Sequence, residues 1–373
     1  MKKILFLHSS AEMYGSDRSL LNIVKYIDKQ KFQIFVILPC HGPLLEQMKQ
    51  IQGVYVEIFE VAVLRRKNLS LRGSVEYINS FRTSSRYLKS FIRKNRIDIV
   101  YTNTSVIFPG AVAARHTGTR NVWHVREIIN SKMENAVISK VIHHYADIVI
   151  TNSQETARAL RIPQEKIRVV YNAVEEKEDS EITVHEGPVI GMAGRINRWK
   201  GQKLLVDAAE QVHRIFPEAV FKFAGCAYTG EEYLEKELKE YISDKGLQNV
   251  VTLCGQIDDM DRFYSSLDVF VLPSIQPEPF GLVVIEAMEY GLPVIATNHG
   301  GPTEIIEDGV DGYLVDYTDS GEMAQRLIEL LKDEKLRRYM GVNGKRKKRS
   351  MFAIENMVQC IDTVICDVLK NGS

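Results

Sequence analysis

The sequence contains few cysteines, and their arrangement is not typical of a stable cross-link or a metal site. The five cysteines among the 373 residues are scattered, and no two of them form a C-x-x-C pair. An odd, scattered set argues against both a disulfide framework and a zinc site. We therefore expect a protein of the reducing cytosol. The cysteines are Cys40, Cys226, Cys254, Cys360 and Cys366.

Long hydrophobic runs are also missing. No stretch approaches the about 18 consecutive apolar residues that a membrane-spanning helix needs. The first apolar run, residues 4–7, follows two lysines and stops at His8, so it is too short for a signal peptide and is predicted to form a first strand. We expect a soluble protein.

Net charge is absent as well, because 48 Lys and Arg balance 48 Asp and Glu, but the charges are unevenly distributed. Residues 1–175 carry 26 cations against 14 acids, which leaves 22 against 34 for the remainder. A basic first half would be attracted to an anionic membrane face, where each nearby cation contributes about 1 kcal/mol. For nucleic acid, the other polyanion, the sequence has no recognition motif, so we expect no such partner. The alternative is that ordinary solvated surfaces share the charges unevenly.

Short apolar runs alternate with segments of helical length, which is the β-α-β pattern of a doubly wound parallel sheet. The pattern stops in the acidic segment 176–187, which we predict to be a linker, and then begins again. We therefore predict an α/β fold of two Rossmann-like domains, residues 1–175 and 188–351, that face a central cleft. Apolar residues on a helical spacing at 352–370 predict a last helix that packs back on the first domain. The predicted strands are residues 4–7, 32–38, 54–59, 97–101, 122–125 and 147–151, then 189–194, 220–224, 250–253, 269–272, 294–297 and 312–315.

Open parallel sheets bind ligands at the carboxyl ends of their strands, and a first cluster of candidate binding residues follows the first strand of the second domain. It reads Gly-Arg-Ile-Asn-Arg-Trp-Lys-Gly over residues 194–201. Arg195 leaves the strand and Lys200 begins a helix, so two cations and the helix's amides can converge on one anion, such as a diphosphate. The alternative is two surface cations at an ordinary loop, because short basic motifs arise by chance.

The second cluster follows another apolar strand and reads Pro-Ser-Ile-Gln-Pro-Glu-Pro-Phe-Gly-Leu-Val-Val-Ile-Glu-Ala over residues 273–287. Its prolines and glycine predict a rigid loop before a helix, whose first amides, over residues 280–282, suit phosphate or sugar oxygens. Glu278 and Glu286 are eight positions apart, about 12 Å along a helix. That separation is too large for a catalytic pair and fits two contacts at opposite ends of an extended ligand with hydroxyl groups.

Together these residues resemble the retaining glycosyltransferases of the glycosyl transferases group 1 family, which have the two-domain glycosyltransferase-B fold. The E-x7-E signature of that family is present from Glu278 to Glu286, and its G-R-x4-K-G element is present at residues 194–201. Segments 291–296 and 300–304 match as well, so the resemblance spans nearly the whole chain.

The resemblance implies that both clusters bind a nucleotide diphosphate sugar, the donor substrate of these enzymes. The implied contacts are Arg195 and Lys200 with the diphosphate, Glu286 with the ribose, Glu278 with the hydroxyls of the transferred sugar, the amides of Phe280, Gly281 and Leu282 with sugar and phosphate, and Ile257 with the base.

In the first domain the resemblance points to a turn and to a histidine. Family members have a glycine-rich turn after the first strand that faces the donor phosphates and the acceptor, so the resemblance implies a donor contact at Gly15. Many members have two adjacent glycines there, whereas residues 9–17 contain only Gly15. The lack of a second glycine also argues against a nicotinamide-binding G-x-G-x-x-G. His124 ends a strand and is predicted to face the cleft, where similar enzymes place a histidine beside the transferred sugar. A histidine bonded within the core is the alternative. We expect no metal and no cofactor, because Arg195, Lys200 and the helix amides supply the positive field.

The sequence therefore predicts a retaining, metal-independent hexosyltransferase that uses a donor such as a UDP- or GDP-sugar. The predicted acceptor is a glycan or lipid-linked glycan, in surface polysaccharide or glycoconjugate synthesis. We expect the protein in the cytoplasm, with a peripheral position at the inner membrane face as a hypothesis. The alternatives are a nucleotide-sugar epimerase or hydrolase of the same fold and a non-catalytic nucleotide-sugar-binding subunit. The predicted catalytic residues are His124, Arg195, Lys200 and Glu278.

Overall fold

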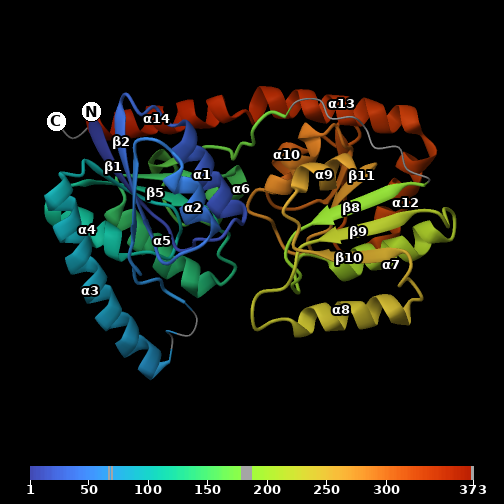
Figure 1. Ribbon diagram of the computed structural model, residues 1–373, viewed down its shortest axis with the longest axis horizontal. Coiled ribbons are helices and arrows are strands. Elements are labelled where there is room, and N and C mark those ends of the chain that lie inside the picture. Colours follow the sequence, from blue (N-terminus) through green and yellow to red (C-terminus); the bar gives the residue numbers. More distant parts are fainter. Residues whose placement is uncertain (66–67, 69, 178–186, 371–373) are drawn as a thin grey trace. The chain divides into compact units, whose positions relative to one another are not determined.

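The computed structural model describes residues 1–65, 68, 70–177 and 187–370. The chain forms two compact units (Figure 1). Unit 1 consists of Met1–Ala173 and Ile354–Ser373, and unit 2 consists of Val174–Ala353. Most of the predicted linker, residues 178–186, lies outside the described residues. Lys177, the residue directly before residues 178–186, belongs to unit 2, where its backbone N–H donates to Glu289 Oε1 at 2.9 Å.

Unit 1 is a seven-stranded parallel sheet with helices on both faces (Figure 1). Side chains alternate between the faces along each strand. Ile4 and Phe6 of β1 therefore pack with α1, α2 and α14, whereas Leu5 and Leu7 pack with α3 and α4. The strand order is β3-β2-β1-β4-β5-β6-β7. The elements are β1 (Lys2–Leu7), α1 (Gly15–Tyr26), β2 (Phe32–Leu38), α2 (Pro43–Lys49), β3 (Val54–Ile58), α3 (Leu71–Asn95), β4 (Ile99–Thr102), α4 (Pro109–Thr117), β5 (Arg120–Val125), α5 (Lys132–Tyr145), β6 (Ile148–Thr151), α6 (Gln154–Ala159), η2 (Gln164–Lys166), β7 (Ile167–Val169) and α14 (Ile354–Lys370).

The C-terminal helix α14 lies in unit 1 although it follows unit 2 in the chain. Its apolar stripe recurs at the helical spacing, and Met357, Ile361, Ile365 and Val368 are buried in the cluster that also contains α1 and β1. This face of the sheet is therefore completed by residues from the far end of the sequence.

Unit 2 is a six-stranded parallel sheet in the order β10-β9-β8-β11-β12-β13. The two doubly wound sheets confirm the predicted fold class. The elements are β8 (Val189–Ala193), α7 (Gln202–His213), β9 (Val220–Ala224), α8 (Tyr233–Asp244), β10 (Val251–Gly255), α9 (Met260–Ser265), β11 (Val269–Leu272), α10 (Leu282–Glu289), β12 (Val294–Thr297), α11 (Pro302–Ile305), β13 (Gly312–Val315), α12 (Ser320–Lys332) and α13 (Glu334–Met351).

Candidate active site

In unit 2 the strand order reverses between β8 and β11, which are parallel neighbours. Connections that leave these two strands turn to opposite faces of the sheet, and a crevice opens outside their carboxyl ends. The two predicted clusters occupy this point, since residues 194–201 follow β8 and residues 273–281 follow β11. The topology thus brings together two loops that are far apart in the sequence.

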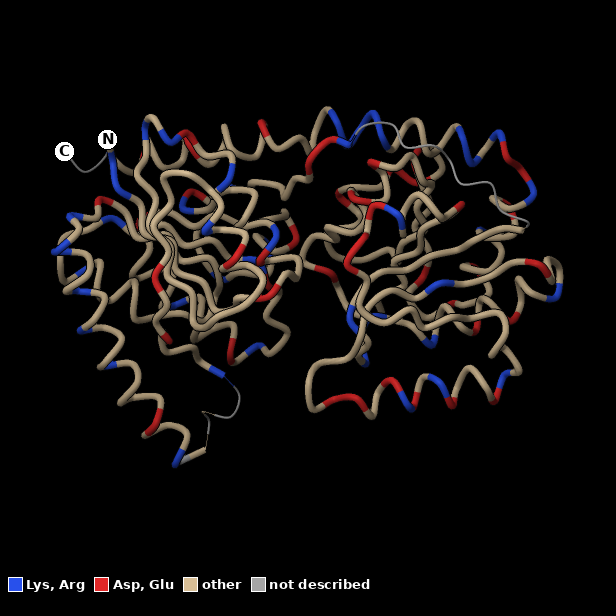
Figure 2. The backbone as a smooth tube through the Cα atoms, in the orientation of Figure 1, with Lys and Arg blue, Asp and Glu red and all other residues tan. Residues whose placement is uncertain are grey.

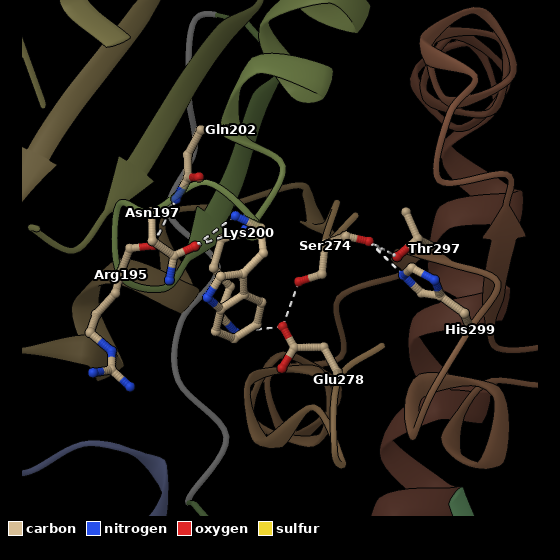
Figure 3. A network of polar contacts seen from close by, with 9 residues as sticks. Arg195, Asn197, Lys200, Gln202, Ser274, Glu278, Thr297 and His299 are labelled. Carbon is tan, nitrogen blue, oxygen red and sulfur yellow. Dashed lines mark hydrogen bonds and ion pairs between the residues drawn. The ribbon is translucent and has the colours of Figure 1, made fainter. Parts of the chain in front are cut away.

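The loop after β8 has a conformation set by its own side chains (Figure 3). Asn197 Oδ1 accepts hydrogen bonds from the backbone N–H of Trp199 at 3.1 Å and of Lys200 at 2.9 Å. Gln202 Nε2 donates to the carbonyl oxygen of Arg195 at 2.9 Å. At Gly201 the backbone is left-handed, with φ +73°, and a Cβ there would lie 1.8 Å from the carbonyl oxygen of Pro273. Only glycine allows this close contact between the two loops.

The loop after β11 is held from the neighbouring strand β12. Ser274 Oγ donates to Glu278 Oε1 at 2.5 Å, while the carbonyl oxygen of Ser274 accepts from Thr297 Oγ1 at 2.6 Å and from His299 Nε2 at 2.7 Å. The N–H of Gly301 donates to the carbonyl oxygen of Glu278 at 2.7 Å. Glu278 is therefore positioned through both its side chain and its backbone.

Lys200 and Glu278 form a direct ion pair across the two loops (Figure 3). Lys200 Nζ lies 2.5 Å from Glu278 Oε1, and the two side chains are only 14% and 7% exposed. The sequence predicted separate ligand contacts for them and did not predict this pair. An ammonium group has three N–H donors, so Lys200 can hold Glu278 and still donate to a ligand oxygen.

Arg195 is held differently from Lys200. Its guanidinium carbon lies 4.0 Å from the centre of the Tyr228 ring, a cation–π contact with the loop that follows β9. Figure 3 shows its side chain pointing away from the Lys200–Glu278 pair. The structure therefore places the two predicted diphosphate contacts in the same loop but does not bring their charged groups together.

Glu286 lies on α10 and is buried, at 4% exposed. Its Oε2 accepts a hydrogen bond from the hydroxyl group of the buried Tyr264 at 2.8 Å. The ring of Tyr290 stacks on Tyr264, and burial raises the pKa of the Tyr290 hydroxyl, so it stays a neutral donor. Glu278 and Glu286 thus have different neighbours, and their contacts with opposite ends of a ligand stay a prediction.

The remaining predicted donor contacts lie around the start of α10 and after β10. Gly281 precedes α10 with φ +96°, and Leu282 is the first residue of that helix. The ring of Phe280 is buried against Phe352, with ring centres 5.8 Å apart, so only its backbone is available to a ligand. Ile257 is half-buried and follows the end of β10 at Gly255.

In unit 1 the predicted Gly15 is exposed and begins α1. The turn before it is organised by Asp17, a residue that the sequence did not single out. Asp17 is buried, its Oδ1 lies 2.9 Å from His8 Nε2, and its Oδ2 accepts from the N–H of Tyr14 at 3.0 Å. The turn therefore depends on one buried carboxylate. Many members of the family that the sequence resembles have a second glycine in this turn.

The structure places His124 in the interior of unit 1, which corresponds to the alternative of a histidine bonded within the core. Its residue exposure is 1%. Because side chains alternate along a strand, Trp123 and Val125 point to the α5 side of β5, and His124 points to the other side, where α14 packs against this strand. Whether His124 acts beside a transferred sugar stays a prediction.

His124 belongs to a buried polar network around Arg126. Its Nδ1 lies 2.6 Å from the Tyr101 hydroxyl and 3.2 Å from Arg126 Nη2. A guanidinium can only donate, so Nδ1 is the acceptor and the proton is on Nε2. Burial, followed by the charge of Arg126, lowers the pKa of His124 well below its ordinary value, and burial lowers the pKa of Arg126 to about 10. The imidazole is therefore neutral.

Sequence reasoning missed the residues that hold the predicted ones in place. Asn197 and Ser274 were inside the quoted motifs, but nothing in their spacing showed which atoms they would contact. Thr297 ends the next strand of the sheet and His299 follows it, so the rule that ligand-binding residues gather at carboxyl ends of strands was the one available signal. For Tyr264 and Tyr228 the sequence contained no such signal.

Two observations concern metals and membranes. Within the ranges that the structure describes, no group of three His, Cys, Asp or Glu side chains is close enough to hold a metal ion. No helix in the same ranges has both the length and the apolar character needed to cross a bilayer.

The fold defines the class of protein. Two Rossmann-like units, each built on a parallel sheet, form the glycosyltransferase-B architecture. Two family models match the chain, Glycosyltransferase Family 4 at residues 13–178 and Glycosyl transferases group 1 at residues 174–347. The chain belongs to the group 1 glycosyltransferases.

Solved structures and curated proteins resemble the chain over nearly its full length. The Anabaena protein Alr3699/HepE, solved in complex with UDP and glucose, is 27% identical, has a TM-score of 0.84, and the match covers 98% of this chain and 100% of that one. The UDP-Gal:alpha-D-GlcNAc-diphosphoundecaprenol alpha-1,3-galactosyltransferase of Escherichia coli is 25% identical, over 99% of this chain and 98% of that protein.

Other relatives match over a shorter length. Spore coat protein SA of Bacillus subtilis is 30% identical over 49% of this chain and 50% of its own length. N-acetyl-alpha-D-glucosaminyl L-malate synthase of Bacillus anthracis is 30% identical over 56% of this chain and 57% of its own length. The chain therefore spans only about half the length of these two relatives.

Proposed function

We propose that this protein is a retaining hexosyltransferase that moves a hexose from a UDP-sugar to a lipid-linked glycan acceptor. The observation that carries the proposal is the Lys200–Glu278 ion pair at the strand-order reversal of unit 2, where a cation and a hydroxyl acceptor lie side by side. UDP as the nucleotide of the donor is supported by the HepE complexes with UDP-glucose and with UDP and glucose, at 26% and 27% identity. The lipid-linked acceptor is supported by the near full-length match to the Escherichia coli galactosyltransferase.

In the proposed donor complex the ligand lies along both loops. Lys200 and Arg195 donate to the diphosphate, and Glu278 accepts from hydroxyls of the hexose. Glu286 accepts from a ribose hydroxyl in addition to the Tyr264 hydroxyl, because a carboxylate has acceptor positions for both. The amides of residues 280–282 bind sugar and phosphate oxygens, and Ile257 packs against the uracil.

The proposed chemistry is electrostatic. As the bond from the anomeric carbon to the diphosphate breaks, negative charge grows on the leaving oxygen, and the ammonium of Lys200 and the guanidinium of Arg195 stabilise it. Lys200 is already held in the site by Glu278, whereas the guanidinium of Arg195 has to turn from the Tyr228 ring towards the diphosphate when the donor binds. Retention follows if the acceptor oxygen attacks from the face that the diphosphate leaves, with a phosphate oxygen accepting the acceptor's proton. The proposal needs no metal, and activity in EDTA equal to that without it is the expected result.

The test is a nucleotide-release assay with UDP-glucose, UDP-galactose, UDP-N-acetylglucosamine and GDP-mannose, run with and without a diphosphoundecaprenol-linked sugar. We expect UDP release that requires the acceptor, and a product whose anomeric configuration by NMR equals that of the donor. Release or donor conversion without acceptor would instead show a hydrolase or epimerase. Thermal stabilisation by UDP-sugars with no turnover on any acceptor would show a binding subunit.

A further inference from the structure

The two helical layers of unit 1 differ in charge. The layer of α3, α4, α5 and α6 contains ten Lys and Arg against three Asp and Glu. The layer of α1, α2 and α14 on the other face contains four against five. The excess positive charge of the helices of unit 1 is therefore confined to one face, and six of its ten cations lie on α3 (Figure 2).

The cations of α3 form a stripe on its outer side. Arg82, Arg86, Lys89 and Arg93 are spaced by four, three and four residues, so they lie within one narrow arc of the helix surface. The three arginines are exposed and Lys89 is half-buried. Among the described residues, none of these four side chains makes a hydrogen bond or ion pair, and the one carboxylate of α3, Glu76, is paired with Arg72.

The same arc continues into apolar residues towards the start of the helix. Val75 and Ile78 are on the stripe at the preceding positions and are 59% and 47% exposed. From Val75 to Arg93 the stripe is about 27 Å long. Two further exposed apolar side chains, Met133 at 78% and Val137 at 58%, lie one helical turn apart on α5 in the same layer.

We propose that this stripe, defined as Val75, Ile78, Arg82, Arg86, Lys89 and Arg93, docks unit 1 on an anionic lipid surface. A row of cations without carboxylate partners attracts lipid phosphates and carboxylates. The transfer of the exposed valine and isoleucine from water to the boundary between headgroups and acyl chains is also favourable. A soluble polyanion such as nucleic acid would use the cations but would leave the apolar residues in water. The inference rests on the proposed lipid-linked acceptor, because docking here would hold unit 1 where such an acceptor is found.

The test is co-sedimentation of the whole protein with vesicles of phosphatidylcholine, with or without one third phosphatidylglycerol. We expect binding only to the anionic vesicles, weakened at high salt by screening. The variant Arg82→Glu/Arg86→Glu/Arg93→Glu should bind at least ten-fold more weakly. The matched control Lys25→Glu/Lys49→Glu/Lys370→Glu makes the same change in net charge on exposed positions of the other layer and should bind within two-fold of wild type.

A second variant tests the apolar part, since Val75→Ser/Ile78→Ser should lose the binding that remains at high salt. Equal losses of vesicle binding in the two charge-reversal variants would show attraction by net charge alone and would contradict the stripe as the docking surface. Binding to a DNA duplex without binding to vesicles would overturn the lipid partner. A UDP-induced thermal shift is measured in every variant, so that a protein that binds UDP but no vesicles refutes only the docking surface, and one that binds vesicles but no UDP refutes only the proposed donor.

Discussion

At the scale of single residues, the Lys200–Glu278 pair joins donor binding to local stability. Both side chains are largely buried, so each neutralises a charge that would otherwise be costly to desolvate. A variant that removes one partner therefore has two effects, a loss of the group that contacts the ligand and an uncompensated buried charge. Only a comparison of single and double variants separates them.

For Lys200→Ala we expect turnover to fall by more than ten-fold, because the leaving diphosphate loses a donor. We also expect the melting temperature to fall, because the largely buried Glu278 loses its ion-pair partner. Lys200→Ala/Glu278→Gln should recover the melting temperature without recovering turnover, as UDP-release and thermal-shift assays would show. Lys203→Ala, on an exposed lysine of the following helix, is the control. Normal turnover in Lys200→Ala would contradict the site.

The lowered pKa of His124 predicts a pH dependence of stability. The folded protein keeps this imidazole neutral, whereas the unfolded chain takes up a proton near the ordinary pKa of 6.5. The unfolded state then binds more protons, so this contribution to stability is present above pH 6.5 and is lost as pH falls below it. In His124→Gln the free energy of unfolding should fall less steeply between pH 7 and pH 5. The exposed His116→Gln should keep the wild-type slope, and parallel slopes in all three proteins would contradict the burial of a neutral His124.

At the scale of elements, the site depends on how closely the strand–helix loops approach each other. Gly201 combines a left-handed backbone with direct contact to Pro273, whereas Gly246 has a similar φ of +70° and no atom within 4 Å of the place where a Cβ would lie. The two glycines therefore share the conformational requirement and differ only in the contact.

We expect Gly201→Ala to weaken donor binding by at least ten-fold, because the loop that carries Lys200 must move away from the loop of Glu278. Gly246→Ala should cost only the strain of the left-handed backbone, about 1 kcal/mol, and leave donor affinity unchanged. Isothermal titration measures the UDP affinity of each variant. Equal affinities in the two variants would show that contact between the loops is not needed for the site.

Some elements could not be predicted from local pattern. The strand β7 has only three residues, too few for an alternation to be visible, and it forms because β6 offers it a partner. The helix α13 contains the basic run Lys345 to Arg349, whose local pattern is that of a solvated surface. In the structure Lys348 is fully buried and its Nζ lies 2.6 Å from Glu289 Oε2, a partner that is supplied by α10.

At the scale of the whole molecule, the chain has two cores, and α14 belongs to the first of them. Ile361 is fully buried among α1 and the sheet of unit 1. Ile361→Ala should destabilise unit 1 by about 2–5 kcal/mol through lost contacts and the cavity left behind. Calorimetry should show this as a lower transition temperature for one unit. UDP at 100 times its Kd should instead stabilise unit 2 by about 2.7 kcal/mol.

The control for this prediction is Thr363→Ala, an exposed position on the same helix, which should leave both transitions unchanged. If Ile361→Ala lowered the transition that UDP raises and left the other unchanged, the assignment of α14 to unit 1 would be wrong.

The sequence by itself determined the strand and helix rhythm, the fold class and the family, because backbone periodicity and short loop motifs are written in neighbouring residues. It also placed Arg195, Lys200 and Glu278 in loops that follow strands, and Glu286 on the helix after the second loop. The tertiary structure alone decided that Lys200 and Glu278, 78 positions apart, form an ion pair, and that His124 is enclosed. Such contacts depend on which strands become neighbours and on which face each side chain lies, and no local pattern contains that information.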